Sequence, residues 1–302
     1  MSFLETDHLM KFFDRFCALD HASLHVEKGS VYGLVGPNGA GKSTIIKHLT
    51  GVYKPDDGTV TLDGEPVYEN PAAKARMMYI PDNLYYFQQA STRDMMKFYQ
   101  GIYPNFSTER YEKLKDIFSN IKEKQNIRRL SKGMQKQVAF WLAVCTNPDV
   151  LILDEPIDGL DPVMRKQVWN ILLDDVAMRG TTVLISSHNL RELEDVCDHV
   201  GIMHKGKVLM EHSLSDLQGN ISKIQIVFEH DLPEFSEQLP ILHTTSVGRI
   251  HTLIMQCSAK TAEEMLSEYH PLLMDPLPLT LEEIFIYELG GNDYAVKELF
   301  LD

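Results

Sequence analysis

A glycine-rich run followed by a lysine and two hydroxyl side chains carries the clearest chemistry in this sequence. The segment from Gly36 to Thr44 matches G-x-x-x-x-G-K-[ST] at every fixed position, between the apolar residues 31–35 and the helix-like residues 45–49. Glycines let backbone N–H groups converge on a polyphosphate, and a helix N-terminus adds its positive end. The spacing therefore predicts a nucleoside triphosphate site rather than an ordinary glycine-rich turn.

The side chains of this loop have separable roles. Lys42 is expected to reach the β- and γ-phosphates, and the Ser43 hydroxyl is expected to hold Mg²⁺. The residues predicted to contact the nucleotide in this loop are Gly36, Asn38, Gly39, Ala40, Gly41, Lys42, Ser43 and Thr44.

Two adjacent carboxylates, Asp154 and Glu155, end a continuous apolar run, residues 150–153, that is typical of a buried parallel strand. In a phosphate-loop fold the first carboxylate can coordinate Mg²⁺ through water. The second can polarise the water that attacks the γ-phosphate. A strand that merely ends in acidic surface residues is the alternative, but the complete phosphate loop favours the catalytic interpretation.

Composition narrows the class of protein. The chain has 302 residues, enough for one large and one small domain, and a formal net charge of −14, which argues against intrinsic nucleic-acid binding. Its four cysteines and twelve histidines are scattered, which indicates reduced thiols in a cytosolic protein and no metal cluster. The N-terminus lacks the pattern of a signal peptide, and the most apolar window, residues 138–145, is too short for a membrane span.

Strand-like and helix-like segments alternate along most of the chain, which predicts an α/β fold with a parallel sheet and helices on its faces. Strand patterns or apolar runs are found in residues 16–35, 59–64, 73–80, 150–154 and 182–186. Helical spacing is found in residues 94–103, 108–124, 133–145 and 162–178.

The pattern restarts near residue 220, so we expect two domains, residues 1–219 and 220–302, the second a small α/β accessory domain. Strand alternation is found there in residues 223–228 and 251–257, and helical spacing in residues 261–269 and 281–289, the last ended by Gly290-Gly291. No ligand motif marks this domain; a dimer contact, a regulatory ligand site and a permease brace remain open.

Three more segments give the sequence a family resemblance. Leu130-Ser131-Lys132-Gly133-Met134 precedes the acidic pair, and Asp158-Gly-Leu-Asp161 and His188 follow it. In this order they resemble the signature motif, D-loop and switch histidine of ATP-binding cassette (ABC) ATPases, over about residues 8–218. The resemblance implies a P-loop domain with a parallel core sheet, an antiparallel β subdomain and a helical insertion at about residues 83–135.

The resemblance also implies residue roles within one chain. Phe13 would stack on adenine, with a core phenylalanine as the alternative. Asp154 would support Mg²⁺, Glu155 would act as the general base, and His188 would contact the γ-phosphate and help to fix the water. Asp161 of the D-loop would belong to the nucleotide-binding residues.

The signature segment implies a second subunit, as in a homodimer. Ser131 and the Gly133 backbone would begin a helix whose N-terminus faces the γ-phosphate held by that subunit, although Ser131 would cap the helix in either case. The segment departs from the usual L-S-G-G-Q at Lys132 and Met134. The implied contact therefore depends on Ser131 and Gly133.

A second departure lies where the strand ending at Pro81 runs into the helical insertion. The family usually has a glutamine there, and this chain has Asp82. Aspartate can still contact Mg²⁺ or a bound water, but it brings a negative charge near the triphosphate, which the metal would partly offset. A metal or water contact by Asp82 and the absence of one are equal alternatives.

The signature variant, the Pro81-Asp82 junction and the tail at residues 279–285 resemble ABC-2-type exporter ATPases of the bacitracin-resistance and acetoin-utilisation-like group. That resemblance implies that ATP joins two subunits and that hydrolysis separates them, powering a separate permease at the inner face of the membrane. Tyr85, Tyr86 and Phe87 would receive the permease or belong to the core. The transported substrate and its direction are not encoded in these motifs.

Two other functions fit parts of the pattern. A soluble ABC ATPase of translation or DNA maintenance is disfavoured by the single cassette, the acidic balance and the lack of coiled-coil arms. A regulatory cassette that binds ATP with little hydrolysis is disfavoured by Lys42, Asp154, Glu155 and His188 together, whereas Asp82 favours it.

Overall fold

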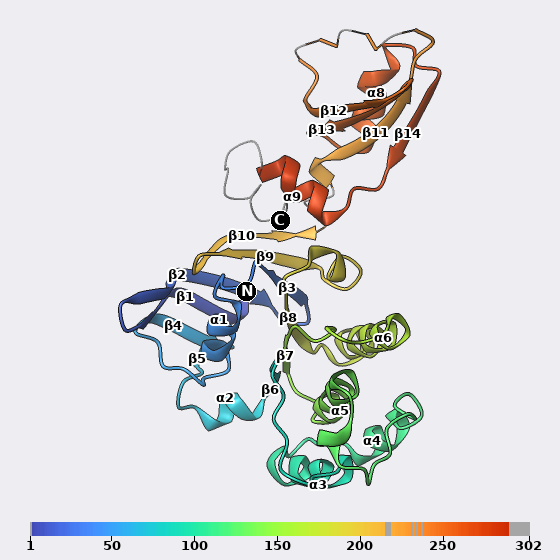
Figure 1. Ribbon diagram of the computed structural model, residues 1–302. Helices are drawn as coiled ribbons and strands as arrows, with labels where there is room; N and C mark the ends of the chain where they lie inside the picture. Colours follow the sequence, from blue (N-terminus) through green and yellow to red (C-terminus); the bar gives the residue numbers. More distant parts are fainter. Residues whose placement is uncertain (1, 215–218, 231, 234, 237, 290–302) are drawn as a thin grey trace. The chain divides into compact units, whose positions relative to one another are not determined.

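The computed structural model describes residues 2–214, 219–230, 232–233, 235–236 and 238–289 (Figure 1). Its contacts divide the chain into two compact units, Met1–His188 with Val196–Glu211, and Asn189–Asp195 with His212–Asp302. The sequence did not indicate that Asn189–Asp195 belongs with the second unit. The domain boundary at residues 219 and 220 remains a prediction.

A six-stranded sheet of order β10-β9-β3-β8-β7-β6 forms the centre of the first unit. Its strands are β3 (Val31–Val35), β6 (Met77–Ile80), β7 (Val150–Asp154), β8 (Thr182–Ser187), β9 (His199–His204) and β10 (Lys207–Ser213). Strands β6, β7, β8, β3 and β9 pair in parallel, and every residue of β3, β7 and β8 is buried. These strands are continuous apolar runs because helices cover both faces of the sheet (Figure 1).

An antiparallel sheet of order β2-β1-β4-β5 lies in the same unit. Its strands are β1 (Ser2–Phe13), β2 (Phe16–Glu27), β4 (Asp57–Leu62) and β5 (Glu65–Pro66). One core joins it to the helix α1 (Lys42–Leu49) and to the parallel sheet, with buried Leu4, Leu24, Leu34, Ile45 and Ile152 in contact. The predicted fold, a phosphate-loop domain with an antiparallel β subdomain, is confirmed, although the sequence patterns did not indicate β1, β9 or β10.

Helices dominate the segment between β6 and β7. They are α3 (Thr92–Ile102), α4 (Thr108–Leu114), the short 3-10 helix η1 (Ile127–Arg129) and α5 (Lys132–Cys145). The predicted helix over residues 108–124 is too long, because turns after Leu114 bring Phe118 into the interior. The Phe118 ring is fully buried and stacks on Trp141 of α5, with centroids 5.4 Å apart.

Two more helices complete the first unit. The predicted strand over residues 73–80 begins as α2 (Pro71–Ala75), which Asn70 caps by accepting from the N–H groups of Ala72 and Ala73, so β6 starts only at Met77. The helix α6 (Pro162–Arg179) lies between β7 and β8 in the chain, close to the predicted range, and ends at Gly180 in the left-handed conformation.

The second unit contains an antiparallel sheet of order β12-β13-β11-β14. Its elements are η2 (Leu190–Glu192), β11 (Ser222–Val227), β12 (Ile241–Val247), β13 (Ile250–Met255), α8 (Ala259–Ser267), β14 (Leu273–Leu277) and α9 (Leu281–Leu289). The sequence missed β12 because almost all of its residues are exposed, and β14 because Pro276 interrupts its pattern. The predicted helix end at Gly290-Gly291 lies outside the described residues.

Gly201 of β9 offers a test of the packing beside the phosphate loop. A Cβ at this position would lie 2.0 Å from the Tyr32 hydroxyl oxygen, and Tyr32 is 1% exposed and donates to Glu211 Oε1 at 2.6 Å. Gly201→Ala should therefore lower the free energy of unfolding by about 1–3 kcal/mol. Gly101→Ala in α3 is the control, because no atom lies within 4 Å of a Cβ there. Urea unfolding followed by circular dichroism measures the unfolding midpoint of each variant and of the wild type. A Gly201→Ala midpoint equal to that of the wild type would contradict this packing.

Candidate functional site

The phosphate loop needs glycine at positions that no other residue fills without strain. Gly39 and Gly41 have φ angles of 82° and 110°, in the left-handed region that glycine adopts freely. At Gly36 a Cβ would lie 2.2 Å from the Met203 carbonyl oxygen of the neighbouring strand β9. These constraints bend the chain between β3 and α1, so that the first N–H groups of the helix face the loop.

Lys42 is the buried cation of this loop, 6% exposed. Its Nζ donates to the carbonyl oxygens of Gly36 and Pro37, at 2.6 and 3.3 Å, and lies 3.5 Å from Glu155 Oε1. A buried ammonium needs a counter-charge, and Glu155 supplies it. The phosphate loop and the end of β7, which are far apart in sequence, are thus joined by an ion pair.

A cavity of about 450 Å³ lies against the phosphate loop. Its lining residues are Phe13, Phe16, Ala18, Pro37, Asn38, Gly39, Ala40, Gly41, Lys42, Ser43, Thr44, Asp82 and Glu155. The cavity therefore brings together most of the residues that the sequence predicts within one chain. It also adds Phe16, whose role no motif indicates.

Two aromatic side chains are among the residues that line the cavity. Phe13 and Phe16 are 42% and 67% exposed, so neither is a core side chain. The edge of Tyr53 supports Phe13, with ring centroids 5.7 Å apart. An exposed ring face at a polyphosphate loop suits stacking on a base.

Asp154 ends β7 as a buried carboxylate, 3% exposed. It accepts hydrogen bonds from the Ser186 hydroxyl and, at 3.5 Å, from the Tyr79 hydroxyl. Burial, followed by the charge of Asp154, raises the pKa of Tyr79, so that this hydroxyl keeps its proton. Ser186 and Tyr79 were not predicted; their hydroxyls supply hydrogen bonds to this buried carboxylate.

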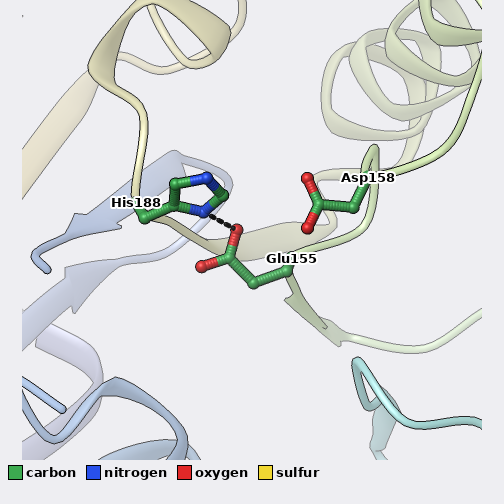
Figure 2. Close-up of side chains that lie close together, drawn as sticks. All are labelled: Glu155, Asp158 and His188. Atoms are coloured by element: carbon green, nitrogen blue, oxygen red, sulfur yellow. Dashed lines mark hydrogen bonds and ion pairs between the residues drawn. The ribbon is translucent and has the colours of Figure 1, made fainter. Parts of the chain in front are cut away.

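Glu155, Asp158 and His188 form a cluster at the ends of β7 and β8 (Figure 2). Nδ1 of His188 lies 2.9 Å from Glu155 Oε2, and one ligand atom of each of the three residues lies within 4.8 Å of the others. Because a carboxylate only accepts, Nδ1 carries the proton in this contact. The sequence predicted Glu155 as the general base and His188 as a γ-phosphate contact that helps to fix the water, and it did not predict their contact with each other. Asp158 was noted only as part of the D-loop.

Asp82 lines the cavity but also has a protein partner. Its carboxylate is 46% exposed, and Oδ1 lies 3.3 Å from Nζ of Lys136 on α5. The predicted metal or water contact by Asp82 remains a prediction.

Gly36, Asp154 and His188 are not among the residues that line the cavity. Ser131, Gly133 and Asp161 do not line it either. Ser131 caps α5 by accepting from the Met134 N–H at 3.2 Å, and Asp161 caps α6 by accepting from two backbone N–H groups at 3.0 Å. A Cβ on Gly133 would lie 2.4 Å from the Gly159 carbonyl oxygen. Each residue thus has a local structural role, and contacts with a partner's nucleotide stay predictions.

Comparison with known proteins adds independent support. A family model described as ABC transporter matches residues 19–158. The chain is 31% identical to the ABC transporter ATP-binding protein YtrB of Bacillus subtilis over 96% of this chain and 99% of that protein. It is 33% identical to the bacitracin transport ATP-binding protein BcrA of Enterococcus faecalis, over 71% of this chain and 70% of that one.

A solved structure is also similar. The structure of an ATP-binding subunit of an ABC transporter superposes with a TM-score of 0.66 and 27% identity, covering 72% of this chain and 92% of the other. Among the described residues, no helix combines the length and the apolar character that crossing a membrane requires. The loop, the acidic strand end and these similarities agree: the chain belongs to the ATP-binding cassette family, as an ATP-binding and ATP-hydrolysing subunit of an ABC transporter.

Proposed function

We propose that this chain hydrolyses ATP with Glu155 as the general base and that hydrolysis drives a separate membrane permease in an exporter. The observation that carries the proposal is the single cavity shared by Phe13, the phosphate loop and Glu155. Adenine would lie on Phe13, and the triphosphate would lie along residues 36–44. Glu155 stands at the end where the γ-phosphate would be.

Mg²⁺ suits the oxygen donors of two residues that the sequence assigns to it, Ser43 and Asp154. Ser43 offers an exposed hydroxyl, and Asp154 offers a buried carboxylate that Ser186 and Tyr79 already orient. Hard oxygen ligands with room for water are the set that Mg²⁺ prefers. When bound, the ion would neutralise charge on the β- and γ-phosphates.

The proposed reaction uses groups that already contact one another. Glu155 accepts a proton from the attacking water, and the N–H of His188 keeps the carboxylate directed toward that water. Lys42 lies close to Glu155, and when ATP binds it would leave this carboxylate and contact the γ-phosphate instead. Its departure would free one carboxylate oxygen to act as the base.

A second copy of the chain would complete the site. Ser131 and Gly133 begin α5 away from the cavity of their own chain, with the backbone N–H groups of a helix N-terminus available for an anion. We therefore propose a homodimer with ATP between the phosphate loop of one copy and the α5 N-terminus of the other.

The permease would bind an aromatic patch on the helical insertion, defined as Tyr85, Phe87, Phe98 and Ile102. These side chains are 76%, 47%, 44% and 53% exposed, and the rings of Phe87 and Phe98 meet edge to face at 5.0 Å. Tyr86 instead points inward and donates to the Gln135 carbonyl oxygen at 2.7 Å. The patch supports docking of a permease helix, and hence a peripheral position at the inner face of the membrane.

Replacing the proposed base tests the hydrolytic claim. Glu155→Gln keeps the shape of the side chain but cannot accept a proton, so the steady-state ATPase kcat should fall about 10²–10⁴-fold. Binding of a fluorescent ATP analogue should persist, because Lys42 and the phosphate loop are intact. Glu109→Gln, an exposed helical carboxylate, is the matched control. Equal rates for wild type and Glu155→Gln would refute the assignment of the base.

The aromatic patch can be tested without knowing the permease. Phe87→Ser with Phe98→Ser should remove most of the chain from salt-washed membranes of its source cells while leaving the ATPase rate of the purified chain unchanged. Met178→Ser in α6 is the control, since this side chain is 84% exposed outside the patch. A wild-type chain that never sediments with membranes would favour a soluble ABC ATPase instead.

A further inference from the structure

Lys136 contacts the backbone carbonyl of the proposed base, Glu155, and has no part in the reaction proposed above. We propose that Lys136 is a positioning residue that ties Asp82 to the backbone of Glu155, so that the loop entering the helical insertion sets the orientation of the base. The inference rests on the proposed role of Glu155. It extends that role from hydrolysis to its regulation.

The contacts of Lys136 are specific and mostly shielded from solvent. Its side chain is only 11% exposed, and Nζ donates to the Glu155 carbonyl oxygen at 2.7 Å while lying 3.3 Å from Asp82 Oδ1. One ammonium group thus joins three segments: the start of α5, the residue after Pro81, and the end of β7. The contact with the Glu155 carbonyl is short and charge-assisted, whereas the contact with the half-exposed Asp82 carboxylate is longer.

The backbone of Glu155 has an unfavourable conformation that neighbouring hydrogen bonds must stabilise. Its φ angle is 47°, in the left-handed region that side-chain-bearing residues rarely adopt. On the N-terminal side, its N–H donates to the carbonyl and hydroxyl oxygens of Ser186, both at 3.2 Å. On the C-terminal side, Lys136 holds its carbonyl. Without this hydrogen bond, the left-handed conformation of Glu155 loses one of its supports, and its carboxylate moves away from His188.

Through Asp82, Lys136 is also connected to an exposed loop. Asp82 begins the loop that carries Tyr85 and Phe87 of the aromatic patch, and Tyr86 of the same loop donates to the carbonyl of Gln135, next to Lys136. A force on the loop therefore reaches Lys136 through the Asp82 carboxylate and through the backbone of α5.

Lys136→Met in the purified full-length chain is the primary test, because methionine keeps much of the length but loses the charge and the donors. The ATPase kcat should fall at least tenfold, whereas KM for Mg·ATP should change less than threefold, since no nucleotide contact is removed. Lys113→Met is the matched control: this lysine is 72% exposed and pairs with Glu109 on its own helix. Thermal unfolding of each variant verifies that it is folded.

A double-mutant cycle separates positioning from a direct metal contact by Asp82. Asp82→Asn should lower kcat several-fold in the wild-type background and have no further effect in Lys136→Met. Independent, multiplying effects would overturn the coupling, as would a folded Lys136→Met with wild-type kcat. If Lys136→Met does not fold, Lys136→Arg, which keeps a cation and donors, must retain more activity than Lys136→Gln. A wild-type chain without ATPase activity would instead overturn the proposed function, and this inference with it.

Discussion

The parallel pairing of β3, β8 and β7 is the constraint on which the site depends. Val35 lies opposite Ser187, and Asp154 lies opposite Ser186, so the strands end at one edge. The ladder continues past the strands, because the N–H groups of Gly36 and Glu155 donate to the carbonyls of Ser187 and Ser186. Buried backbone groups need partners, and this need brings the phosphate loop and Glu155 to one place.

Charge balance then determines how the side chains at this edge are arranged. Lys42 and Lys136 approach Glu155 from two sides, one at its carboxylate and the other at its carbonyl. His188 contacts the second carboxylate oxygen, and Asp154 turns to Ser186 and Tyr79 instead. Two neighbouring acidic residues therefore have different partners, in keeping with the different roles proposed for them.

The sequence predicted those parts of the site that lie in one short segment or at the end of one strand. Gly36 to Thr44 form their loop locally, and Asp154 and Glu155 follow a recognisable apolar run. Lys136 and Phe16 carry no comparable signal, because their contacts depend on how α5 and β2 pack against distant segments. The helix over residues 108–124 was overextended for the same reason: the burial of Phe118 against Trp141 overrode local helical spacing.

The close approach of Gly133 to Gly159 has a consequence for timing. With no room for even a methyl group between them, the first turn of α5 cannot move toward the loop after Glu155 without displacing it. In a dimer, the surface that a chain presents to its partner's ATP would therefore report the state of its own base. In a pair of such chains this coupling would act in both directions, so hydrolysis at one nucleotide site would depend on the state of the other.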